Sequence, residues 1–112
     1  MLEASRYFIV QTTVDTRERA DAMAAMMVTE GIAACVHILP VSSVYRWKGK
    51  IETSEELRVE AKTRASHVGD LMEFIRNAHP YDTPEIIVTP IVNGDARYLE
   101  WLETDTTQTD GE

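Results

Sequence analysis

The chain has 112 residues, 44% of them hydrophobic, so it can bury one core but is too short for two domains. Its 19 acidic residues outnumber its 11 basic ones, and the formal net charge is −8. Such a surface repels the phosphates of nucleic acids and of anionic membranes, so neither is expected as a partner.

The cysteine content and the N-terminal sequence favour the cell interior. Cys35 is the single cysteine and cannot form an internal disulfide. The first residues lack the basic and apolar segments of a signal peptide, and no apolar run reaches membrane-spanning length. We expect a cytoplasmic protein with an N-terminal extension at 1–5, one domain at 6–104 and a flexible polar tail at 105–112.

The first predicted elements are a strand and a helix. Residues 6–14 are rich in β-branched and aromatic side chains, which indicates a strand. Asp15 is the predicted helix cap, and Glu18 completes a pattern that resembles a capping box. Apolar residues then recur at helical spacing until Gly31, where the helix should stop.

A long hairpin is predicted between Ala33 and Thr63. Lys48-Gly49-Lys50 supplies a tight reversal, and apolar and charged residues alternate along the second arm. Pro40 cannot donate to a strand ladder and predicts a bend or bulge in the first arm. A typical strand has about five or six residues. Arms this much longer should project beyond the body of the domain.

A second helix, a fourth strand and a terminal helix are predicted after the hairpin. Ser66 is the predicted cap of a second helix, beside a solvated His67, and His79-Pro80 ends this helix. A strand is expected at 85–92 and a short terminal helix at 95–102. The order strand, helix, strand, strand, helix, strand predicts an α+β protein with a ferredoxin-like split βαβ sandwich, followed by a short C-terminal helix.

Apolar residues on both sides of the last strand indicate self-association. Ile86 and Val88 alternate with Ile87 and Ile91, whereas two helices cover only one face of the sheet. A neighbouring subunit reached by the hairpin would cover the other face, and closed rings are the usual end point of such contacts. The interface candidates are Tyr45, Trp47, Ile87, Ile91 and Trp101.

Four strings in register carry a resemblance to a known family. They are Ala33-Ala34-Cys35-Val36, Tyr45-Arg46-Trp47-Lys48-Gly49-Lys50-Ile51, Lys62-Thr63 and His79-Pro80-Tyr81-Asp82-Thr83-Pro84-Glu85-Ile86. With these strings the chain closely resembles the CutA divalent-ion-tolerance proteins. The resemblance implies a cytoplasmic ferredoxin-like homotrimer, similar in architecture to the PII signalling proteins and involved in the response to copper and other divalent metal ions. It implies no obligatory cofactor, with copper or another divalent cation as the candidate ligand.

Three residues are candidate metal ligands. Cys35 and His37 lie two positions apart on a predicted strand, so they project from one face, although a structural zinc site needs about four ligands. The alternatives are a small buried cysteine and an ordinary hydrogen-bonded histidine. In copper-binding relatives, the resemblance implies a cysteine late in the first strand and histidines before the Pro-Tyr pair. This chain has Gln11, Ala78 and His79 there, so only His79 is retained.

A ligand cleft between subunits is the second site hypothesis. Its candidate residues are Trp47, Lys62, Tyr81, Asp82 and Glu85, because aromatic walls with converging charges suit a small ligand. The alternative is structural: a turn after the second helix and a plain salt bridge between Lys62 and Glu85.

No catalytic residue is predicted, because the serines of the hairpin have no base near them in the sequence. The leading hypothesis is therefore a trimeric protein that binds a divalent metal. A PII-like sensor of a small anionic metabolite near Lys62, and a trimeric scaffold without a metal site, remain the alternatives.

Overall fold

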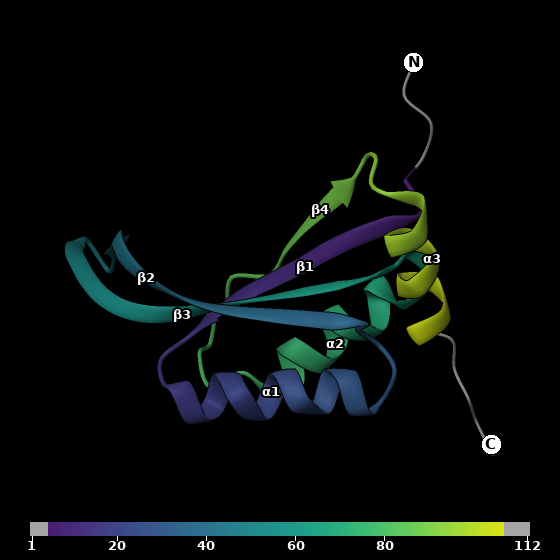
Figure 1. Cartoon of the computed structure of the whole chain (residues 1–112). Helices are drawn as coiled ribbons and strands as arrows, with labels where there is room; N and C mark the ends of the chain where they lie inside the picture. Colours follow the sequence, from purple (N-terminus) through teal and green to yellow (C-terminus); the bar gives the residue numbers. More distant parts are fainter. Residues whose placement is uncertain (1–4, 107–112) are drawn as a thin grey trace.

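The computed structural model of the chain describes residues 5–106. The predicted extension and tail lie outside these residues, except for Ser5, Asp105 and Thr106. Helices and strands follow in the expected order (Figure 1): β1 (Tyr7–Val14), α1 (Arg17–Thr29), β2 (Cys35–Trp47), β3 (Lys50–Arg64), the 3₁₀ turn η1 (Ala65–His67), α2 (Val68–Ala78), β4 (Ile87–Ile91) and α3 (Ala96–Asp105).

The four strands form one antiparallel sheet with the order β2-β3-β1-β4. Helices α1 and α2 lie together against one face of this sheet (Figure 1), which confirms the predicted α+β, ferredoxin-like sandwich. Fully buried side chains gather between the helices and the sheet; Met27, Leu71, Ile75, Val10 and Val59 are among the largest. The opposite face of the sheet has no helical layer over most of its area.

Two helix starts differ from the prediction. Thr16, not Asp15, caps α1: its Oγ1 accepts a hydrogen bond from the Arg19 amide, while the Asp15 carboxylate accepts one from the Arg19 side chain. Ser66 lies inside the 3₁₀ turn and caps nothing, so α2 begins at Val68. Neighbouring residues of similar capping chemistry compete for such positions, and only the backbone path decides between them.

The hairpin follows the prediction closely. Lys48 and Gly49 both have positive φ, 51° and 80°, as a two-residue type I′ turn requires. The register runs unbroken from Cys35 opposite Lys62 to Trp47 opposite Lys50, so there is no bulge at Pro40. Strand β2 is an edge strand, where a missing amide donor is tolerated. The hairpin nevertheless curves as it leaves the sheet (Figure 1).

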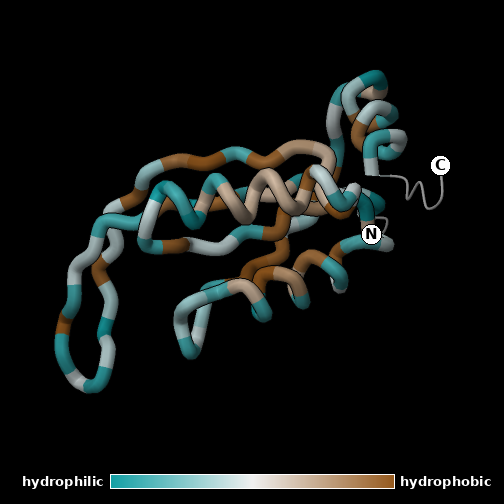
Figure 2. Tube along the Cα trace, turned by 90° about the horizontal axis from the view of Figure 1, so that it is seen from below, coloured by the Kyte–Doolittle hydropathy of each residue, from teal (hydrophilic) through white to brown (hydrophobic). Residues whose placement is uncertain are grey.

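The far part of the hairpin lies outside the core. Figure 2 shows apolar segments gathered between the helices and the sheet, whereas the projecting hairpin is mostly hydrophilic with isolated apolar positions. Those positions are exposed: Val44 is 70% accessible and Ile51 62%. The sequence of this arm therefore provides apolar side chains that the chain itself does not bury.

Helix α3 lies against the end of the uncovered face. Asp95 caps it by accepting hydrogen bonds from the amides of Arg97 and Tyr98.

The expectation that His67 is solvated is wrong: its ring is buried and hydrogen-bonds through Nε2 to the Thr106 carbonyl. Strand β4 is shorter than predicted, because regular pairing with β1 begins only at Ile87.

Candidate functional site

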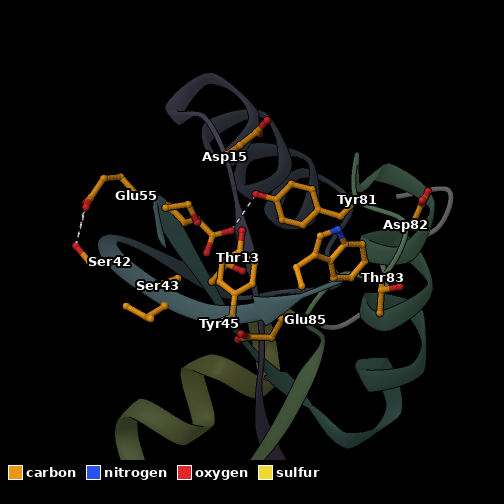
Figure 3. A pocket seen from close by; sticks show the side chains of 14 residues that line it. Thr13, Asp15, Ser42, Ser43, Tyr45, Glu55, Tyr81, Asp82, Thr83 and Glu85 are labelled. Carbon is orange, nitrogen blue, oxygen red and sulfur yellow. Dashed lines mark hydrogen bonds between the residues drawn. The ribbon is translucent and has the colours of Figure 1, made fainter. Parts of the chain in front are cut away.

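A pocket of about 790 Å³ lies between the curved hairpin and the segment 81–85 that leads from α2 to β4 (Figure 3). The hairpin contributes both of its arms, and the end of β1 contributes the remaining wall. The lining residues are Thr13, Asp15, Ser42, Ser43, Val44, Tyr45, Trp47, Ser54, Glu55, Glu56, Tyr81, Asp82, Thr83 and Glu85.

His79 holds the segment 81–85 in place against β1. Its Nδ1 accepts a hydrogen bond from the Tyr81 amide at 3.2 Å, so its other nitrogen, Nε2, carries the proton and donates to the Thr13 carbonyl at 2.8 Å. The His79 and Tyr81 rings also meet edge to face, 4.6 Å between centroids. Because Pro80 cannot continue the helix, the chain turns here and Tyr81 faces the hairpin.

Tyr81 links this segment to β3. Its hydroxyl donates to a carboxylate oxygen of Glu56 at 2.9 Å, a contact drawn as a dashed line in Figure 3. Burial is the main cause that raises the pKa of Tyr81 well above its ordinary value, and the hydrogen bond to the negative Glu56 raises it further. The phenol therefore remains a neutral donor at physiological pH.

The pocket is acidic. Its lining includes five carboxylates and no lysine, arginine or histidine. Glu55 accepts from the Ser42 hydroxyl at the end of the pocket opposite Asp82 in Figure 3. Glu85 accepts from the Gln11 side-chain amide at 2.9 Å. These donors are neutral, so they orient the carboxylates without cancelling their charge.

Four of the five predicted cleft residues line this pocket: Trp47, Tyr81, Asp82 and Glu85. Lys62 does not line it within one chain. Its ammonium lies 5.5 Å from the centre of the Tyr98 ring and 3.3 Å from the Tyr98 hydroxyl, so the alternative of a Lys62–Glu85 salt bridge is not formed. Whether a second subunit brings Lys62 to the cleft stays a prediction.

Sequence reasoning missed Glu55, Glu56 and the serines as binding residues. The register carries a signal for them, because a reversal at Lys48-Gly49 places Ser42 opposite Glu55 and Ser43 opposite Ser54. The three serines line the pocket, no histidine does so among the described residues, and the Ser42 hydroxyl donates to the Glu55 carboxylate.

The structure does not bring the predicted metal ligands together. Cys35 is partly buried and His37 is exposed, both on the uncovered face, whereas His79 lies beyond α2 with both ring nitrogens in hydrogen bonds. Within residues 5–106, no group of three His, Cys, Asp or Glu side chains is placed to hold a metal ion. The Gln11 side-chain amide donates a hydrogen bond to Glu85, so the residues at the positions of the relatives' copper ligands do not fit a copper site.

The interface candidates are largely exposed. Tyr45, Trp47, Ile87 and Trp101 are 44%, 47%, 46% and 40% accessible, and Ile91 is partly buried. Ile87 and Ile91 share the uncovered face of β4. Hairpin, β4 and α3 thus present apolar side chains to the outside of this chain.

These features define a class: a small ferredoxin-like protein with an extended hairpin and an acidic surface pocket. A family model described as "CutA1 divalent ion tolerance protein" matches residues 8–105, and the chain belongs to this family. It is 42% identical over 99 residues to "Protein CutA, chloroplastic" of Arabidopsis thaliana, covering 88% of this chain and 54% of that protein. It is 40% identical over 95 residues to "Divalent-cation tolerance protein CutA" of Citrobacter koseri, covering 84% of this chain and 83% of that one.

Solved structures agree with the fold. The structure of CutA from Synechococcus elongatus aligns with a TM-score of 0.90 at 32% identity, covering 95% of each chain. CutA1 from Oryza sativa aligns with a TM-score of 0.87 at 38% identity, covering 95% of this chain and 97% of that one. The chain spans about half the length of the plant relatives it matches in sequence. Among the described helices, none combines the length and hydropathy needed to cross a membrane.

Proposed function

We propose that this chain works as a non-catalytic, PII-like homotrimer of the cytoplasm that contributes to tolerance of divalent cations by binding copper or another divalent metal weakly. Membership of the divalent ion tolerance family across residues 8–105 is the observation that carries the proposal. The acidic composition and the single cysteine support an intracellular location, although the plant relatives are named as chloroplastic.

The trimer is supported by apolar surface that one chain leaves exposed. Val44 and Ile51 lie near the tip of the hairpin, and Ile87 lies on the uncovered face of the sheet. Apolar side chains on a projecting arm gain free energy when a second copy removes them from water, at about 25 cal/mol per Å². In a closed ring of identical contacts, the apolar side chains of every hairpin and of every uncovered sheet face are buried against a neighbouring copy.

Light scattering coupled to gel filtration tests the trimer. The particle mass should be three times the 12.7 kDa of the chain. Replacing Val44 and Ile51 together by serine should shift the mass toward the monomer. Met26→Ser is the matched control, because Met26 is 49% accessible but belongs to α1 and not to the projecting hairpin. A monomeric wild type would contradict the proposal.

Metal capture is assigned to Cys35 and His37. They share the uncovered face of β2, and neither side chain makes a hydrogen bond to another described residue. A thiolate and an imidazole suit soft and borderline metals, but two protein ligands give only weak binding.

Calorimetric titration with copper(I), copper(II) and zinc(II) should therefore show weak binding that Cys35→Ser and His37→Asn abolish. The control is His79→Gln, which should leave metal binding unchanged because both ring nitrogens of His79 already have hydrogen-bond partners. A wild type that binds no better than the Cys35→Ser, His37→Asn double variant would refute direct capture.

A small-ligand sensor is the second candidate, and the pocket favours it. Its volume lies within the range of about 300–1,000 Å³ found for small-molecule sites. The acidic lining, however, opposes the anionic metabolite that sequence alone suggests. A thermal-shift screen separates the candidates, because a ligand that binds the folded state raises its apparent stability.

A further inference from the structure

We infer that the pocket between the hairpin and residues 81–85 binds a small organic cation, an ammonium or guanidinium group carried on a flat apolar body. The inference rests on the role as a binding protein proposed above, but it does not depend on metal capture at Cys35 and His37, which lie outside the pocket lining.

Charge selects a cation. Glu55, Glu56 and Glu85 accept hydrogen bonds from a serine hydroxyl, a phenol and an amide, all of them neutral. Asp15 has a cationic partner, Arg19, at 3.1 Å. Within one chain no basic side chain is part of the lining, so the chain's own side chains give the pocket a negative potential that attracts cations and repels anions.

Aromatic walls select an organic cation. Tyr45, Trp47 and Tyr81 line the pocket, and ring faces attract ammonium and guanidinium groups while offering area for a flat body. The Lys48 ammonium, 5.9 Å from the Trp47 ring centre, already uses this attraction from outside the pocket lining. Tyr81 remains a neutral phenol, so it adds no charge of its own.

A bare divalent ion fits this pocket less well. Hard cations such as calcium and magnesium need about six or more converging oxygen ligands. No group of three ligating side chains converges among residues 5–106, and Glu55 and Glu56 each accept a hydrogen bond from a different donor. A cation with an organic body can span these separated groups.

The test uses the full chain and three probes of one shape: phenethylammonium chloride, neutral 2-phenylethanol and anionic sodium 3-phenylpropanoate, at constant ionic strength. Titration is followed by the two indole N–H signals in ¹H–¹⁵N spectra, because Trp47 lines the pocket and Trp101 does not. Phenethylammonium should shift the Trp47 signal saturably and leave that of Trp101 in place. Equal binding of the neutral probe, or no saturable shift with the cation, would overturn the inference.

Charge-neutral variants locate the site. Glu56→Gln and Glu85→Gln should each raise the Kd for phenethylammonium about 5- to 10-fold, as expected for a charge lost a few Å from a cation at a partly exposed site. Glu73→Gln on the exposed side of α2 removes the same charge far from the pocket and should leave the Kd unchanged. Equal effects of all three would show nonspecific attraction and reject the site.

Failure of the proposed function gives a different result. A chain that is monomeric or binds no metal, yet shifts Trp47 with phenethylammonium alone, retains the pocket inference. A trimer that binds metal at Cys35 and His37 but does not discriminate among the three probes would contradict the pocket inference.

Discussion

Replacing Tyr81 by phenylalanine should loosen the contact between the hairpin and the segment after α2. The change removes one hydroxyl, which donates to Glu56 at 2.9 Å in a half-buried position. Hydrogen bonds to charged groups are worth about 1.5–3 kcal/mol when buried. Because this one is partly open to solvent, we expect a loss of about 1 kcal/mol.

The raised pKa of Tyr81 predicts how its contribution to the free energy of unfolding changes with pH. The pKa of Tyr81 is raised by folding, so the stabilisation is fully present below the ordinary tyrosine value of about 10. Above pH 10 the unfolded chain releases this proton while the folded chain retains it, and stability falls with rising pH. The advantage of wild type over Tyr81→Phe should therefore shrink from about pH 10 upward.

Urea unfolding at a fixed chain concentration measures this effect at pH 7.5, 9 and 10.5. With a slope of about 1–3 kcal/mol per molar urea, the midpoint should drop by about 0.5 M at the two lower values. Tyr45→Phe is the control, since Tyr45 lines the same pocket but its hydroxyl makes no hydrogen bond to a described residue. Identical midpoints for wild type and Tyr81→Phe at pH 7.5, or a constant gap up to pH 10.5, would refute the reasoning.

Three further predictions concern the ends of the fold. The pKa of Glu103 is lowered, first by the Tyr7 hydroxyl that donates to it, so its stabilisation is present above about pH 4.5 and is lost on acidification; acid titration of Glu103→Gln by circular dichroism should show a flatter profile. His67→Leu removes one of the two hydrogen bonds to the buried Thr106 carbonyl and leaves the one from Arg64 at 3.3 Å, so we expect a cost of about 1 kcal/mol and faster hydrogen exchange in α3. Gly49→Ala strains a residue at φ 80° by about 1 kcal/mol, visible as a lower melting temperature.

Local patterns predicted the elements because their causes lie within a few residues of each other. Alternation along 51–63 identifies β3, and Lys48-Gly49 fixes its register with β2. Pro40 illustrates the limit: a missing donor is visible in sequence, but its effect depends on whether the strand is at the sheet edge. The sheet order, which sequence suggests only through the ferredoxin-like topology, decides that no bulge is needed.

The site was predicted in part because it combines a local and a distant component. Tyr81, Asp82 and Glu85 belong to one short segment whose turn is evident from Pro80. Glu56 meets Tyr81 across 25 residues, and the curvature of the hairpin has no signal in a pattern of alternating residues. Within one chain Lys62 contacts Tyr98 on α3, 36 residues away, and its predicted place in a cleft between subunits stays a prediction.

The histidines show why family membership does not by itself supply a metal site. The chain has three. His67 closes the end of α3 onto the sheet, and His79 joins the segment after α2 to β1 through both ring nitrogens. Two of the three histidines therefore make structural hydrogen bonds, and His37, near Cys35, is the remaining candidate for binding copper or zinc. Direct metal capture reduces to this one pair on the uncovered face, physically separate from the acidic pocket, so the two binding proposals stand or fall independently.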